Sequence, residues 1–75
     1  MPRRSIDEQI GERVQKHRQL ASVNVHAAAA RCELSPESYL ASEQGERRFQ
    51  ANELYDLATY FGVCFSAFIT GLTLD

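Results

Sequence analysis

The sequence predicts an all-α domain, a five-helix orthogonal bundle over residues 6–72. Apolar residues recur at three- and four-residue steps, and no stretch alternates with the period of two that is typical of strands. Cap-forming residues and glycines divide the chain into short helical segments. A chain of 75 residues has room for one domain. Residues 1–5 are expected to be a flexible basic arm and residues 73–75 a C-terminal tail.

The first predicted helix runs from Ile6 to Leu20. Ser5 is the expected N-cap, and Glu8 completes a capping-box pattern three residues later. An apolar face at helical spacing would direct this helix to the core. The residues on that face are Ile6, Ile10, Val14 and His17.

Two shorter helices are predicted at residues 25–32 and 36–44. Asn24 is the expected N-cap of the first, whose four consecutive alanines strongly favour a helix. The second begins with Ser35 as N-cap and Pro36 at the first helical position, where a missing N–H costs nothing. A short turn joins the two helices.

The last two helices follow a polar loop. Gly45 is placed to end the third helix in a left-handed conformation, and Gly62 stops the fourth. The fourth begins near residue 51. Its apolar face comprises Leu54, Leu57, Ala58 and Phe61. Ser66 is the expected cap of a fifth, short helix that carries Phe68 and Ile69 and ends at Gly71.

Charge and cysteine content narrow the function classes. A net charge of −2 argues mildly against nucleic-acid binding, but basic residues gather in the first quarter and at Arg47 and Arg48. Cys32 and Cys64 are expected to be small buried apolar side chains, since neither has partners at metal-ligand spacing. We expect no metal, no cofactor, no membrane contact and a cytoplasmic protein, because neither a signal peptide nor a membrane-length apolar run is present.

An enzyme is the least favoured class. The sequence contains no nucleophile–base pair, no clustered carboxylates and no glycine-rich phosphate loop, and His17 and His26 are isolated. We therefore expect no catalytic residues and no small-molecule substrate.

The middle of the chain resembles a known family. Two helices joined by so short a turn fit a helix-turn-helix unit. The run IGERVQKHR at Ile10–Arg18 resembles the first helix of Cro/CI-type (XRE-like) helix-turn-helix proteins, and Ala51–Val63 resembles their fourth helix and turn. The positions that match the family's common Ser, Glu, Gly and basic residues are Ser35, Glu43, Gly45, Arg47 and Arg48. The resemblance covers about residues 6–72.

The resemblance implies a lambda-repressor-like fold and a bacterial DNA-binding transcriptional regulator. Such a protein would dock on double-stranded operator DNA as a homodimer, at the nucleoid. The alternative is a degenerate helix-turn-helix that acts as a protein–protein interaction module, either an adaptor or antirepressor-like. The resemblance also implies an ion pair between Arg18 and Glu43 that orients the third helix, as against two solvated surface charges.

The family pattern implies DNA contacts at ten positions. Residues 36–44 would be the recognition helix, and Arg47 and Arg48 the most plausible phosphate contacts. The full set is Asn24, Val25, His26, Ser35, Pro36, Glu37, Ser38, Ala41, Arg47 and Arg48. Ala41 offers contact only to a thymine methyl, and Glu37 can accept from cytosine N4. We therefore expect phosphate contacts and DNA shape to outweigh base-edge hydrogen bonds.

The C-terminal part is dense in aromatic and apolar residues. Phe61, Phe65 and Ile69 are expected in the core, and part of the remainder forms an exposed patch that marks an interface. The predicted dimer interface is Tyr60, Phe65, Phe68, Leu72 and Leu74. The alternative is a monomer with a few ordinary exposed apolar residues.

Overall fold

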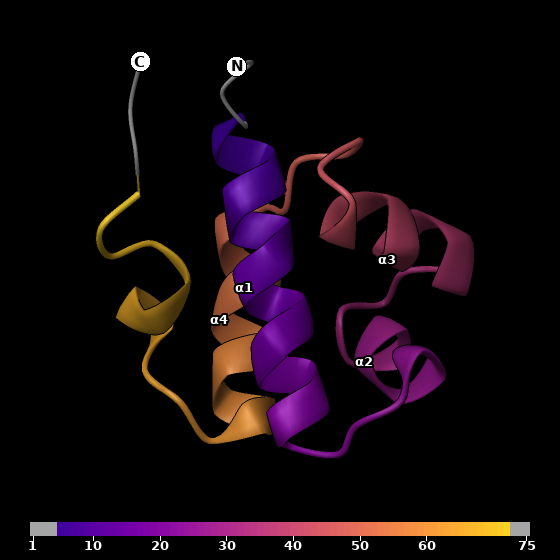
Figure 1. Ribbon diagram of the computed structural model, residues 1–75. Coiled ribbons are helices and arrows are strands. Elements are labelled where there is room, and N and C mark those ends of the chain that lie inside the picture. Colours follow the sequence, from indigo (N-terminus) through magenta and orange to yellow (C-terminus); the bar gives the residue numbers. More distant parts are fainter. Residues whose placement is uncertain (1–4, 73–75) are drawn as a thin grey trace.

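The structure, a computed structural model, describes residues 5–72, which are helical throughout apart from the connecting turns (Figure 1). The elements are α1 Ile6–Leu20, α2 Val25–Arg31, α3 Pro36–Glu43, α4 Ala51–Phe61 and a 3₁₀ turn, η1, Phe65–Phe68. The predicted all-α class is confirmed. The expected arm, apart from Ser5, and the expected tail with Leu74 lie outside the described residues.

Three of the four N-caps predicted from the sequence are confirmed. Glu8 N–H donates to Ser5 Oγ at 3.1 Å, and the Ser5 N–H donates to the Glu8 carboxylate at 2.8 Å. The Ala27 N–H donates to Asn24 Oδ1 at 2.8 Å. The Ser35 hydroxyl accepts from the N–H of the third residue of α3 at 3.1 Å. Each cap satisfies a backbone donor that the first turn leaves without an intrahelical acceptor.

The prediction of a fifth helix is wrong, because η1 is a single 3₁₀ turn and the described residues contain four α-helices. Cys64, not Ser66, occupies its N-cap position, and Ser66 lies inside the turn. The segment is bracketed by Gly62 and Gly71, whose φ values of 75° and 73° are left-handed. So short a segment forms only the structure that its tertiary packing imposes.

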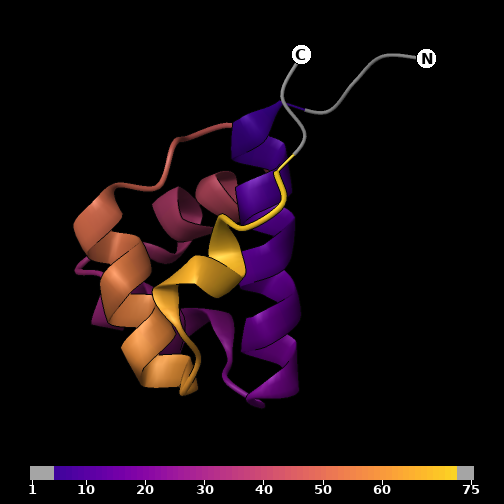
Figure 2. The ribbon, with the colours of Figure 1, turned by 90° about the vertical axis from the view of Figure 1, so that its left-hand side faces the viewer.

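The helices pack around α1, the longest of them. In Figure 1, α2 and α3 lie on one side of α1 and the segment that contains η1 lies on the other. Figure 2 shows η1 between α4 and α1, and η1 contacts both helices. α3 contacts α1 and α2, and α2 also contacts α4. This arrangement leaves α3 at the outside of the bundle.

The core draws on every element. Its buried hydrophobic residues are Val14, Ala28, Ala29, Cys32, Tyr39, Phe49, Leu54, Leu57, Ala58, Phe61 and Phe68. The whole predicted apolar face of α4 is buried, which confirms that prediction. The two predicted roles at the C-terminal end are reversed: Phe68 is fully buried, whereas Ile69 is 39% exposed. A 3₁₀ turn has three residues per turn, so Phe65 and Phe68 share its inner side and Ile69 is left outside.

The two cysteines differ. Cys32 is buried as predicted, and its burial raises the pKa of the thiol to about 12. The prediction for Cys64 is wrong, because this residue is exposed in the turn between α4 and η1. The left-handed Gly62 ends α4 just before it, and Cys64 is the extended residue that precedes η1.

Candidate nucleic-acid interface

The helix-turn-helix is formed by α2, α3 and the turn between them (Figure 1). Ala28 and Ala29 are buried, and their small side chains let the short α2 pack closely on α3 and α4. Glu33 adopts a left-handed φ of 60° in the turn, and the Leu34 N–H donates to the Ala29 carbonyl at 2.9 Å. The turn therefore closes its own backbone hydrogen bonds and directs α3 across the surface.

α3 divides into an inner and an outer face. Tyr39, Ser42 and Glu43 are buried against the bundle. The residues expected to face DNA lie on or beside the outer face, where Glu37 is exposed and Pro36, Ser38 and Ala41 are half-buried. Leu40 is exposed on the same face, and Ser35 is exposed at the start of the helix. The structure thus brings the candidate recognition residues to one side of α3.

A buried ion pair holds α3 on α1. Arg18 Nε donates to Glu43 Oε2 at 2.8 Å, and the two side chains are only 12% and 2% exposed. Arg18 also donates to the Val23 carbonyl at 3.1 Å. The hydrogen bond to Glu43 raises the pKa of Arg18. The fixed guanidinium thus ties α1, the following turn and the end of α3 together.

Tyr39 lies beside this pair. Its side chain is fully buried, and within residues 5–72 its hydroxyl has no hydrogen-bond partner. Burial and the nearby Glu43 carboxylate both raise the pKa of the phenol. The tyrosine is therefore neutral, and its ring packs edge-on against Phe49 with centroids 5.9 Å apart.

Arg47 is occupied inside the domain, which differs from its expected role as a phosphate contact. Its guanidinium donates to the two Glu53 carboxylate oxygens at 3.0 and 2.9 Å and to Ser42 Oγ at 3.0 Å. Sequence reasoning missed Glu53, although its place at the third position of α4 is a capping signal. Its carboxylate also accepts from the Gln50 N–H at 2.9 Å.

These contacts set the charge state of Glu53. Burial alone would raise the pKa of its carboxyl group. The hydrogen bonds from Arg47 and from the Gln50 N–H outweigh burial, so the pKa of Glu53 falls below its ordinary value. The hydrogen bond to Glu53 in turn raises the pKa of Arg47. Both groups are charged at neutral pH, and the Arg47–Glu53 ion pair fixes the loop between α3 and α4.

Arg48 is the exposed cation of this loop. Its side chain is 79% exposed and pairs with Asp7 at the start of α1, with Nε 2.9 Å from Oδ1. An ion pair as exposed as this one contributes about 0–1 kcal/mol to the stability of the fold, so it opens readily. Arg48 is therefore available to a phosphate, whereas Arg47 would first have to leave Glu53.

The start of α2 is less open than the sequence indicates. Asn24 and His26 are exposed, but the Asn24 side chain is occupied by the Ala27 N–H. Val25 is half-buried and packs against the core. Of these three expected contacts, only the His26 side chain lies both exposed and outside the caps and the core.

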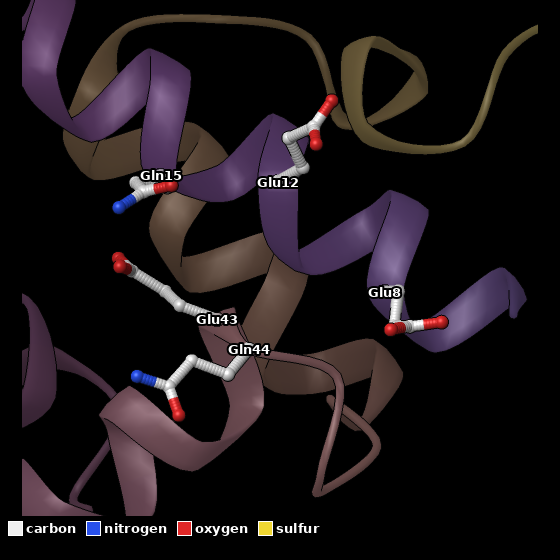
Figure 3. Close-up of a pocket in the computed structure, with 5 residues that line it drawn as sticks. All are labelled: Glu8, Glu12, Gln15, Glu43 and Gln44. Atoms are coloured by element: carbon white, nitrogen blue, oxygen red, sulfur yellow. The ribbon is translucent and has the colours of Figure 1, made fainter. Parts of the chain in front are cut away.

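A hollow lies between α1 and the end of α3 (Figure 3). Its lining residues are Glu8, Glu12, Gln15, Glu43 and Gln44. Three of the five are carboxylates, so the hollow disfavours a phosphate group. Within residues 5–72, no group of three or more His, Cys, Asp or Glu residues is placed to hold a metal ion. In the same range, no helix has the length and apolar content to span a membrane.

The predicted dimer residues are only partly exposed. Tyr60 is exposed, Phe65 and Leu72 are half-buried, and Leu74 lies outside the described residues. Phe68 is fully buried, so its assignment to an interface is wrong. Its ring packs edge-on against His17 and Phe61 in the core, with centroids 5.7 and 6.4 Å apart.

Sequence reasoning also missed one exposed aromatic residue. Tyr55, on the outer side of α4, is 64% exposed, and its ring lies near that of Phe65 with centroids 6.5 Å apart. Arg31 lies over the Tyr60 ring at 5.4 Å. Between residues 51 and 72 the charged residues are Glu53, which is buried, and Asp56. The α4–η1 surface, defined here by Tyr55, Tyr60, Phe65 and Ile69, therefore has little charge of its own, and the Arg31 guanidinium borders it at Tyr60.

Neither a protein-family model nor a curated protein sequence matches this chain. Solved structures match its fold. The clp gene regulator ClgR from Corynebacterium glutamicum gives a TM-score of 0.84 at 18% identity, over 91% of this chain and 72% of that chain. The restriction-modification controller protein C.AhdI from Aeromonas hydrophila gives 0.74 at 18% identity, over 83% and 94%. An HTH_3 family transcriptional regulator from Vibrio cholerae gives 0.72 at 24% identity, over 84% and 35%. The chain therefore has the helix-turn-helix fold that these transcriptional regulators share.

Proposed function

We propose that this domain is a bacterial DNA-binding transcriptional regulator that docks α3 in the major groove of duplex operator DNA, at the nucleoid. The observation that carries the proposal is the outward face of α3, held on a rigid frame by Arg18–Glu43 and Arg47–Glu53 and left uncovered by the rest of the bundle. The fold likeness to transcriptional regulators supports it. A preorganised frame lowers the ordering cost of binding.

The salt dependence of DNA binding tests this proposal. Wild-type protein is expected to bind random duplex DNA with an affinity that falls steeply as salt rises, because phosphate contacts release counterions. Arg48→Ala should lower the slope of log K against log salt by about 0.9, the contribution of one phosphate contact. Fluorescence anisotropy with a labelled duplex measures both quantities.

Lys16→Ala is the matched control, since Lys16 is an exposed cation on α1 and lies about 160° around this helix from Arg18, which contacts α3. It should leave the slope unchanged. An equal loss of slope in both variants would contradict the role of Arg48. Absence of binding at low salt would overturn the DNA proposal.

That last result would favour a second function, a protein–protein interaction module. The observation behind this alternative is the outer face of α3, where Glu37 and Leu40 replace the cations common in DNA readers. A net charge of −2 points the same way.

We further propose that the protein is a homodimer through the α4–η1 surface. Interface centres are depleted in charge and enriched in Tyr and Phe, as this surface is. Light scattering after size exclusion is expected to give twice the chain mass of 8.5 kDa at high micromolar concentration. Tyr55→Glu with Tyr60→Glu should give the monomer mass, because two buried carboxylates would be left without partners.

Leu20→Glu serves as the control for the dimer. Leu20 is 71% exposed at the far end of α1, so its charge should not change the mass. A monomeric wild-type protein would contradict the dimer without affecting the proposal for α3.

A further inference from the structure

The chemistry of α3 departs from the common ways of reading bases. Its eight residues, PESYLASE, contain no Arg, Lys, Asn, Gln or His. The bidentate pairing of Arg with guanine and of Asn or Gln with adenine is therefore absent from the helix itself. Gln44 follows the helix, and its side chain lines the hollow beside Glu43 (Figure 3). Base contacts from α3 must come from its apolar, acidic and serine side chains, and the Ser38 hydroxyl is already engaged with the Ser35 hydroxyl at 3.1 Å.

Leu40 provides the apolar contact. It is 39% exposed at the middle of the outer face, next to the half-buried Ala41. In the major groove, the apolar group that base edges present is the C5-methyl of thymine. A leucine that stays in contact with water in the free domain gains free energy by covering such a methyl group.

Glu37 provides the polar contact. Its carboxylate is exposed in the first turn of α3, and it forms no ion pair with the other described residues. A carboxylate only accepts hydrogen bonds, and its characteristic partner in the major groove is the N4 amino group of cytosine. The acidic contact thus selects a pyrimidine, as does the apolar one.

The spacing of these residues puts both contacts on neighbouring bases. Glu37 lies three and four residues before Leu40 and Ala41, so the side chains share one face at about 5–6 Å between Cβ atoms. Successive bases in a strand are about 3.4 Å apart. We infer that α3 reads a pyrimidine tract, with Glu37 on a cytosine and Leu40 and Ala41 on adjoining thymine methyl groups. This inference rests on the proposed DNA-binding function.

Removing the methyl groups from the DNA tests the inference without altering the protein. Duplexes are first selected from a random library with the full chain, and each thymine of the bound sequence is then replaced singly by deoxyuridine. One or two replacements should weaken binding about fourfold each, the value of one buried methyl group. In Leu40→Ala, the same replacements should have less effect, because the partner of the methyl group is gone.

Two further variants complete the experiment. Leu20→Ala removes an exposed leucine outside α3 and should keep the full sensitivity to deoxyuridine. Glu37→Gln should shift the selected base from cytosine towards adenine, since an amide pairs with adenine N6 and N7. Binding that is indifferent to every deoxyuridine, or selected sequences without a pyrimidine run, would overturn the inference while leaving DNA binding intact. Failure to bind any duplex at low salt would instead overturn the proposed function itself.

Discussion

Gly11→Ala is expected to destabilise the domain by about 3 kcal/mol or more, at the upper end of the cost of overpacking. A Cβ atom at this position would lie 2.6 Å from the Ser42 carbonyl oxygen and 2.7 Å from the Glu43 carbonyl carbon, and closer still to the Glu43 oxygen. These are backbone atoms at the end of α3, so no side-chain rotation relieves the clash. Urea unfolding followed by circular dichroism measures the loss.

Helix propensity alone predicts the opposite sign. Alanine is favoured over glycine by about 1 kcal/mol in a helix interior. Gly62→Ala is an informative comparison, because an added Cβ there meets no atom within 4 Å and the cost is confined to the left-handed backbone, about 1–2 kcal/mol. Gly11→Ala should therefore be the more damaging change. Stability equal to wild type would show that α1 and α3 separate without cost.

Arg18→Met is the second change with a large expected effect, a loss of about 3–5 kcal/mol. It leaves the Glu43 carboxylate, whose side chain is 2% exposed, without its charged partner. It also leaves the Val23 carbonyl without the donor that Arg18 supplies. A chain of 75 residues has a total stability of about 4–11 kcal/mol. The expected loss is therefore at least about a quarter of the total stability, and thermal or urea unfolding measures it.

The double variant Arg18→Met/Glu43→Leu distinguishes a stranded charge from lost packing. Replacing a whole buried ion pair by apolar side chains is often neutral or stabilising. The double variant should therefore be more stable than Arg18→Met alone. If the double variant is instead less stable than Arg18→Met, the unpaired Glu43 carboxylate is not the cause of the loss of stability in Arg18→Met.

Local signals explain why the first half of the fold follows from the sequence. Ser5, Asn24 and Ser35 act on backbone groups within three residues of themselves, so a cap pattern fixes a helix start without reference to the rest of the chain. The C-terminal segment offers only Ser66 as a cap signal, and this signal misleads, because Ser66 lies inside the 3₁₀ turn. The sequence predicts Ile69 in the core and Phe68 at the surface, and the structure has them the other way round. The reason is that the helical period there changes from 3.6 to three residues per turn.

The candidate site divides in the same way. The outward position of Glu37 and Ala41 follows from the helical period once α3 is placed. The occupation of Arg47 by Glu53 does not, because a surface loop and a helix start must first meet in space. The sequence pattern of an arginine in a polar loop does not distinguish a side chain that contacts a phosphate from one that pairs with a carboxylate. The assignment of individual DNA contacts remains a prediction.

α1 has one further consequence for a dimeric regulator. One side of it meets α3 through Gly11 and Arg18, and another side meets the C-terminal segment, where Arg13 donates to the Thr70 carbonyl and His17 packs on Phe68. Arg13 and His17 lie at nearly the same levels along α1 as Gly11 and Arg18, so the two contact sides are separated by the width of the helix and not by its length. An α-helix is a stiff rod of about 10–12 Å across with its side chains. In the proposed dimer, the separation of the two recognition helices, and with it the spacing of operator half-sites, would depend on the width of this single helix.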